Sequence, residues 1–196
     1  KNAFKNPLSF RYLDDNFIES DAVKIGKTFM DYLKKTKDPR IHVYCSLKDG
    51  NTEFDKQFGL PNGYDSHTIA DAPSGSFVGL ENTSNFNINT ILRLDAPTIF
   101  LMPSETKLLL AEAVLRNWTN GNAEVLYKEA ITSSMKEQEI AYGTQGKITD
   151  EEIETYLAQN LFSTANNTEK LQIIGEQYLV ATFINGYESY ANWRRT

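Results

Sequence analysis

The chain has 196 residues, of which 40% are hydrophobic and 23% are charged, so it is long enough to bury a core and is neither a disordered nor a fibrous protein. Its net charge is −6 and no basic stripe is present, which argues against nucleic acid as a partner because affinity for a phosphate backbone depends on clustered Lys and Arg. No apolar run approaches the roughly 20 residues that span a bilayer, and the single cysteine, Cys45, excludes an internal disulfide.

Residues 16–47 form the first predicted segment, with a helix followed by a short strand. Apolar residues at helical spacing predict a helix from about Asp21 to Lys35, which ends at Asp38-Pro39 because a residue before proline favours extended geometry. Residues 41–47, IHVYCSL, are β-branched and aromatic, and they predict a strand.

Residues 48–94 are rich in Gly, Asn, Asp, Ser and Pro, and they predict a long irregular loop region with several turns. Loops of this length in compact domains are usually functional when they are ordered. Five aromatic residues fall in it without helical spacing: Phe54, Phe58, Tyr64, Phe77 and Phe86. These rings either anchor the loop to the scaffold or face a ligand.

Residues 97–196 form a predicted helical scaffold. Helices are expected over about 104–118 with Ser104 as the N-cap, 122–137, 149–159 with a capping box at its start, 169–183, and 187–195. Ala111, Ala123, Tyr127 and Ala130 are expected at a helix–helix contact, because two helices approach closely where alanines face a ring. The spacing of the last three is that of the second helix of a tetratricopeptide repeat.

The predicted fold class is therefore mainly α, with tetratricopeptide-like helix pairs, a long irregular loop region and little β structure, in a single domain over residues 1–196. For the final helix, Trp193-Arg194-Arg195 predicts cation–π stacking or a buried salt bridge from a guanidinium to a carboxylate, in preference to a free anion site. Trp193 and Arg194 are expected to tie this helix to the scaffold.

Nothing in the sequence predicts an enzyme, a metal site or a cofactor. His42 and His67 are the only histidines, and no metal-ligand spacing, nucleophile elbow or phosphate-binding loop is present. No catalytic residue is assigned. A pair of carboxylates for glycoside hydrolysis stays open, because its members are recognised by their separation in space.

Two segments of the chain resemble the SusD/RagB-type outer-membrane nutrient-binding lipoproteins. The run from Met102 to Ala113, followed by Gly121 and Tyr127, is similar to a helix pair of that family. Gln177-Tyr178-Leu179, Asn185-Gly186-Tyr187-Glu188 and Trp193-Arg194-Arg195-Thr196 are similar to its terminal run. Asp38-Pro39-Arg40 and the turn at residues 59–63 also fit. The matching segments follow the same order as in the family and span the whole chain. The resemblance implies that the chain corresponds to roughly the C-terminal half of such a protein.

The resemblance implies a protein that binds an oligosaccharide or another nutrient and works with a TonB-dependent, SusC-like transporter. It also implies a surface-exposed location at the outer membrane through a lipid anchor that is not part of this chain. The alternative is a soluble tetratricopeptide-like adaptor that binds a protein or peptide. An adaptor predicts tandem helix pairs with near-equal spacing.

The ligand is expected to meet the loop region 48–94, where turn-rich sequence presents side chains outward. Tyr64 and Phe77 are the predicted stacking residues, with Asn62 and Asp65 as hydrogen-bond partners, because a sugar has flat C–H faces and hydroxyl groups. Tyr64 is favoured because Pro61-Asn62-Gly63 fixes a turn immediately before it, which lowers the entropy lost on binding.

Overall fold

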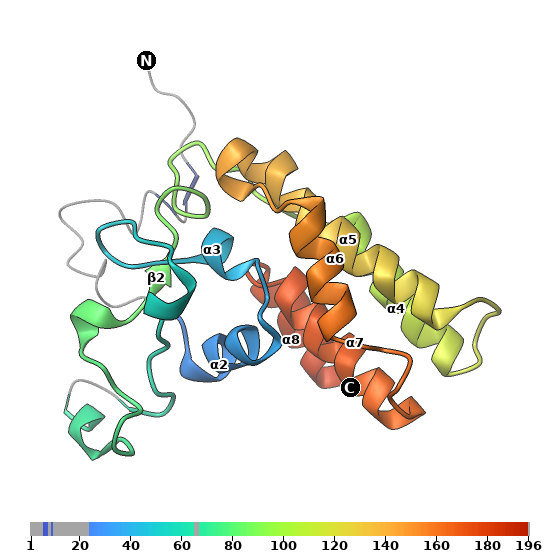
Figure 1. The fold of residues 1–196 in the computed structure, drawn as a ribbon, viewed down its shortest axis with the longest axis horizontal. Helices are drawn as coiled ribbons and strands as arrows, with labels where there is room; N and C mark the ends of the chain where they lie inside the picture. The colour runs from blue at the N-terminus through green and yellow to red at the C-terminus, as the bar shows by residue number, and fades with distance from the viewer. Residues whose placement is uncertain (1–5, 8, 10–23, 65–66, 196) are drawn as a thin grey trace. The chain divides into compact units, whose positions relative to one another are not determined.

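The computed structural model describes residues 6, 7, 9, 24–64 and 67–195, and the chain divides into two compact units (Figure 1). The first unit comprises Lys1–Pro97 and Ala141–Lys147, and the second comprises Thr98–Ile140 and Ile148–Thr196. The first unit contains most of the irregular structure, whereas the second is helical.

Helix α2 (Lys27–Thr36) is the main helix of the first unit and buries Met30 and Leu33. It ends where predicted, because Lys37 adopts a left-handed conformation with φ 51° and its N–H bonds back to the last turn. The predicted start at Asp21 is wrong for the described part of that range. Ile25 is extended instead, since its N–H donates to the Ser84 carbonyl and its carbonyl accepts from the Leu60 N–H. The residues before Lys24 in the predicted helix lie outside the described residues.

The predicted strand over 41–47 is also wrong in its first half, because Ile41–Tyr44 form a short helix, α3. Only Cys45–Ser46 (β1) are extended, and they pair antiparallel with Asn85–Phe86 (β2). The helical turn follows from Arg40, whose carbonyl accepts hydrogen bonds from the Val43 and Tyr44 N–H groups. Ile41, Val43 and Tyr44 are all buried, so this run lacks the strict alternation of apolar and polar residues that distinguishes a half-buried strand from a helix.

Where the structure describes it, the loop region 48–94 contains three 3₁₀ turns besides β2: η2 (Phe54–Lys56), η3 (Ile69–Asp71) and η4 (Leu80–Asn82). Buried polar side chains hold it in place. The Gln57 amide donates to two loop carbonyls and accepts from the Ser84 hydroxyl at 2.8 Å. Thr90 donates to the Val43 carbonyl and Asn87 to the His42 carbonyl, which fixes the end of the loop to α3. The region is ordered because its backbone polar groups find partners without regular structure.

The helical unit contains α4 (Pro103–Leu115), α6 (Asp150–Gln159), α7 (Asn167–Ala181) and α8 (Gly186–Arg195), together with most of α5 (Ala123–Tyr142). The last two residues of α5 and the 3₁₀ helix η5 (Gly143–Gly146) belong to the first unit. Helix α4 packs against α7, and α7 against α8. All five predicted helices are present. None of the helices within the described ranges has the length and apolar character needed to cross a membrane.

The predicted start of α4 is wrong by two residues. Met102 is the N-cap and Pro103 is the first helical residue, where the missing N–H of proline costs nothing. The Glu105 carboxylate accepts from the Met102 N–H at 3.0 Å. Ser104 is instead buried, and its hydroxyl donates to Glu137 of α5 at 2.6 Å.

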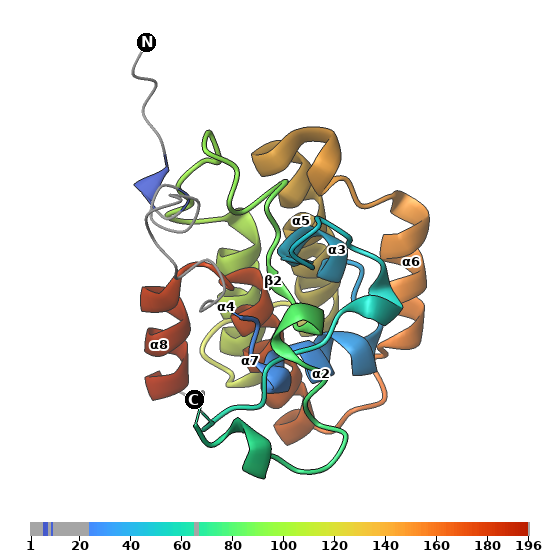
Figure 2. The ribbon, with the colours of Figure 1, turned by 90° about the vertical axis from the view of Figure 1, so that its left-hand side faces the viewer.

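Helices α4 and α5 form the predicted tetratricopeptide-like pair and run side by side (Figures 1 and 2). Ser104 and Lys107 of α4 bond to Glu137 and Glu129 of α5. The four residues expected at a close helix contact are all buried: Ala111, Ala123, Tyr127 and Ala130. Tyr127 also stacks on the Phe162 ring, with centroids 4.5 Å apart and an interplanar angle of 15°.

Candidate functional site

The turn at residues 59–64 lies against the N-terminus of α2, and backbone contacts fix it there. The Leu60 carbonyl accepts from the Lys27 N–H at 2.7 Å, and the Leu60 N–H donates to Ile25 at the same distance. Gly59 lies so close that a Cβ atom would stand 2.4 Å from the Lys27 Cα. Only glycine allows this approach, and the turn is therefore held rigidly.

Asn62, a predicted ligand residue, already has a structural role in this turn. Its side-chain oxygen accepts from the Thr28 N–H at 3.4 Å and from the Thr28 hydroxyl at 3.3 Å, so it satisfies part of the free N-terminus of α2. Gly63 follows with φ 86°, which sets the direction of the chain at Tyr64. Tyr64 is half-buried, and Asp65 lies outside the described residues.

Phe77 belongs to a different turn. Pro73–Ser76 close it through the Ser76 N–H and hydroxyl, which both donate to the Pro73 carbonyl, and Phe77 follows half-buried. Among the described residues no ring contact joins Phe77 to Tyr64. The structure therefore brings Asn62 and Tyr64 together on one turn and does not pair them with Phe77.

Phe58 has the anchoring role that was the alternative for the loop aromatics. The Lys34 ammonium group lies 4.3 Å from the centre of the Phe58 ring, and it also donates to the Asp55 carbonyl at 3.3 Å. Lys34 thus holds this part of the loop on α2 by a cation–π contact and a hydrogen bond.

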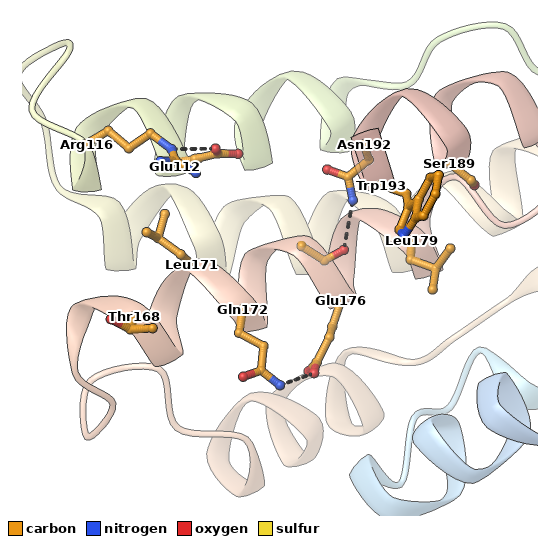
Figure 3. A pocket seen from close by; sticks show the side chains of 11 residues that line it. Glu112, Arg116, Thr168, Leu171, Gln172, Glu176, Leu179, Ser189, Asn192 and Trp193 are labelled. Atoms are coloured by element: carbon orange, nitrogen blue, oxygen red, sulfur yellow. Dashed lines mark hydrogen bonds and ion pairs between the residues drawn. The ribbon is translucent and has the colours of Figure 1, made fainter. Parts of the chain in front are cut away.

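A groove of about 710 Å³ lies on the helical unit between α4, α7 and α8 (Figure 3). In Figure 3 the Glu112–Arg116 pair lies at one end, and the Trp193 indole lies beside Leu179 at the other. The lining residues come from α4 and the residue that follows it, from α7 and from α8: Glu112, Arg116, Thr168, Leu171, Gln172, Gly175, Glu176, Leu179, Ser189, Asn192 and Trp193. No motif in the sequence predicts this groove.

The charged end of the groove is held by a network between α4, α7 and α8. Glu112 accepts from the Arg116 Nε at 2.7 Å and from the Arg195 guanidinium. Burial opposes ionisation of the Glu112 carboxyl, but these two guanidinium groups outweigh it and hold its pKa below the usual value. Arg195 also donates to Asn192 at 2.7 Å, and Asn192 donates to the Gly175 carbonyl at 3.3 Å. The predicted guanidinium–carboxylate bridge is therefore present, although only its Glu112 side is buried.

The expectation that Trp193 and Arg194 tie the last helix to the scaffold is wrong. Trp193 is 73% exposed, and its ring lies 5.8 Å from that of Tyr190 on the same helix. The Arg194 guanidinium is likewise exposed and lies 6.0 Å from the Tyr190 ring centre. Arg195 connects α8 to α4, which leaves the Trp193 indole at the surface of the groove.

A second hollow of about 610 Å³ lies where the residues before α4 meet the start of α8. Phe100 and Tyr187 border it and are 81% and 91% exposed. The Asn185 amide donates to the Phe100 carbonyl at 3.2 Å across it.

The reactive side chains of the described residues have ordinary structural environments. No cluster of three or more His, Cys, Asp or Glu residues within the described ranges could hold a metal ion. Cys45 is buried, and burial raises the pKa of its thiol, which disfavours the thiolate. His42 lies 3.3 Å from the Lys147 carbonyl.

A family model described as starch-binding and associating with the outer membrane, with the name SusD-like, matches residues 2–196. A SusD homologue from Bacteroides fragilis matches with a TM-score of 0.74 and 24% identity, over 95% of this chain and 42% of that one. A chitin-binding protein matches with a TM-score of 0.70 and 23% identity, over 98% of this chain and 40% of that one. No curated protein matches the chain. The chain thus spans about two fifths of the length of these solved proteins.

Proposed function

The chain belongs to the SusD-like family, and from that membership we propose that it is a surface-exposed lipoprotein that captures an oligosaccharide at the outer membrane and passes it to a TonB-dependent, SusC-like transporter. The observation that carries the proposal is the match of a family model for outer-membrane-associated starch binding to almost the whole chain. The role is binding without catalysis, and it needs no metal or cofactor.

The proposed ligand contacts in the loop region are Asn62, Tyr64 and Asp65, together with Phe77, which follows a different turn. Support comes from the rigidity of the turn before Tyr64, since Gly59 and Asn62 fix that turn on α2. A ring that is held in place before the ligand arrives loses little entropy when a sugar stacks on it. Because Asn62 Oδ1 is already bonded to Thr28, the amide nitrogen is the part of Asn62 that meets a sugar hydroxyl.

Calorimetric titration of the purified protein with maltoheptaose and with chitohexaose tests the loop site. We expect Tyr64→Ala and Phe77→Ala each to weaken binding of the preferred sugar about tenfold, while their melting temperatures stay near that of the parent. Tyr187→Ala is the matched control, because it removes a ring that is 91% exposed outside the loop. Equal affinity in the parent and both loop variants would remove this surface from the proposal.

The alternative function, a tetratricopeptide-like adaptor, has less support. The α4–α5 pair has 13 and 20 residues and the α6–α7 pair has 10 and 15, so the helices do not repeat at equal length. Affinity capture from solubilised outer membranes separates the two functions. Recovery of a TonB-dependent transporter supports the proposal, and binding of a soluble peptide without any sugar supports the adaptor.

A further inference from the structure

The α4–α7–α8 groove is lined in part by Gly175, a glycine in the interior of a helix. Gly175 lies inside the 15-residue helix α7, where glycine is less favourable than alanine because it loses more backbone freedom on folding. A Cβ atom at this position would meet nothing within 4 Å, and no positive φ requires a glycine here. Packing within the described residues therefore does not account for it. The missing side chain leaves the middle of the groove open.

The walls of the groove combine one flat apolar face with several hydrogen-bonding groups. The exposed Trp193 indole provides the face, next to Leu179 (Figure 3). Gln172 and Glu176 bond to each other at 2.7 Å along the exposed side of α7, and Figure 3 shows them between the two ends. A pyranose ring has the complementary pattern, with C–H groups on its faces and hydroxyls around its edge.

The walls are also fixed before any ligand binds. Asn192 is buried and bonds to both Gly175 and Arg195, which sets the position of α8 against α7 and so the position of the neighbouring Trp193. Glu112 is held by two guanidinium groups. A preorganised groove of about 710 Å³ is in the size range of small-molecule sites.

We propose that this groove is a second oligosaccharide-binding site, in which one pyranose ring stacks on Trp193 and its hydroxyls meet Gln172 and Glu176 over the open floor at Gly175. The choice of a sugar as the ligand rests on the proposed function, whereas the site lies outside the loop surface proposed above.

The chain has only two tryptophans, so a Trp118→Phe background leaves Trp193 as the single reporter. Phenylalanine at this position keeps a ring for the Arg116 guanidinium, which lies 5.5 Å from the Trp118 ring centre. We expect maltoheptaose or chitohexaose at saturation to reduce acrylamide quenching of Trp193 at least twofold. The reduction is expected to persist when Tyr64→Ala is added, because Tyr64 does not line the groove.

Two variants of Gly175 form a matched pair. Gly175→Leu fills the groove and is expected to abolish the protection of Trp193, whereas Gly175→Ala should keep most of it and melt no lower than the parent. If circular dichroism shows that Gly175→Leu does not fold, Trp193→Ala takes its place, and its binding of the same sugars is measured by calorimetry. The Trp193 indole is 73% exposed, so its removal should not unfold the protein. We expect Trp193→Ala to lose the part of the binding heat that comes from sugar binding in the groove.

Sugar binding with unchanged Trp193 quenching, and with unchanged affinity in Gly175→Leu and Trp193→Ala, would overturn the second site and leave the proposed function standing. Failure of both sugars to bind the parent anywhere would overturn both. A concentration-dependent dimer in sedimentation that Trp193→Ala abolishes would identify a second copy of the chain as the occupant of the groove, and would also overturn the proposal.

Discussion

Arg195 is expected to stabilise the final helix on the scaffold by joining it to α4, and its replacement by alanine tests this directly. Its guanidinium connects α8 to Glu112 of α4, a partner 83 positions away in the sequence. Arg194, the adjacent residue, has the same charge and contacts only the Tyr190 ring among the interactions found for it in the described part of the chain. Arg194→Ala is therefore a matched control.

The magnitude follows from the burial of the pair. Breaking a fully buried pair costs about 3–5 kcal/mol, and an exposed pair contributes about 0–1 kcal/mol. The Glu112 side chain is only 5% exposed, but that of Arg195 is 35% exposed, and Glu112 keeps Arg116 as a partner at 2.7 Å when Arg195 is removed. We expect Arg195→Ala to lower the free energy of unfolding by about 1–2 kcal/mol and Arg194→Ala by less than about 0.5 kcal/mol.

The dependence on pH gives a second check. Because the pKa of folded Glu112 lies below its ordinary value of 4.5, the unfolded state binds the proton more tightly. The stabilisation is therefore present above pH 4.5 and is lost as the pH falls through the lower pKa of the folded state. Urea unfolding at pH 7, 5 and 3 should show the difference between parent and Arg195→Ala shrinking in acid, and Glu112→Gln should remove most of that trend. Equal losses in Arg195→Ala and Arg194→Ala would refute the reasoning.

Two other predictions concern stability. Gly59→Ala should destabilise by about 1–3 kcal/mol, because the new Cβ would stand 2.4 Å from the Lys27 Cα, whereas Gly175→Ala in open space within a helix should stabilise by about 0.5–1 kcal/mol; opposite shifts in thermal melts check this pair. Glu105 is buried with one carboxylate oxygen unpartnered among the described residues, and burial raises its pKa, so its stabilisation of the fold is lost as the pH rises. Glu105→Gln should therefore stabilise the fold more at pH 7 than at pH 4, and a gain of the same size at both values would contradict this.

The helices of the second unit could be predicted because their signals are local. Thr149 accepts from the Glu152 N–H at 3.2 Å while the Glu152 carboxylate accepts from the Thr149 N–H at 2.8 Å, so four consecutive residues are enough to mark the start of α6. Local signals gave the wrong start for α4. Ser104 is a residue type that often caps helices, but its hydroxyl donates to Glu137, 33 residues later, and does not cap the helix.

The first unit was harder to predict because distant partners decide its local structure. Ile25 is extended since Ser84 and Leu60 supply its hydrogen bonds, and nothing near Ile25 in the sequence indicates them. The residues after Arg40 have strand-like composition but form α3. Hydrogen bonds from Asn87 and Thr90 of the loop region to the His42 and Val43 carbonyls hold them in this conformation. Composition did predict that residues 48–94 are irregular, since turn residues act locally.

The position of Trp193 shows why the groove could not be predicted from the sequence. Consecutive residues on a helix point about 100° apart, so packing Asn192 against α7 turns the next side chain toward the surface. Hydrophobicity alone favours the opposite choice, with the indole inside and the amide outside. Asn192 is buried because its amide donates to the Gly175 carbonyl of α7 and accepts from Arg195 of its own helix. The first bond depends on how α7 and α8 pack together, which the residues around Asn192 in the sequence do not indicate. Hydrogen bonds that join Glu188, Ser189 and Asn192 to Tyr178, Thr182 and Gly175 together set which face of α8 packs inward. Asn192→Leu removes one of these contacts and should therefore weaken the orientation that leaves Trp193 exposed.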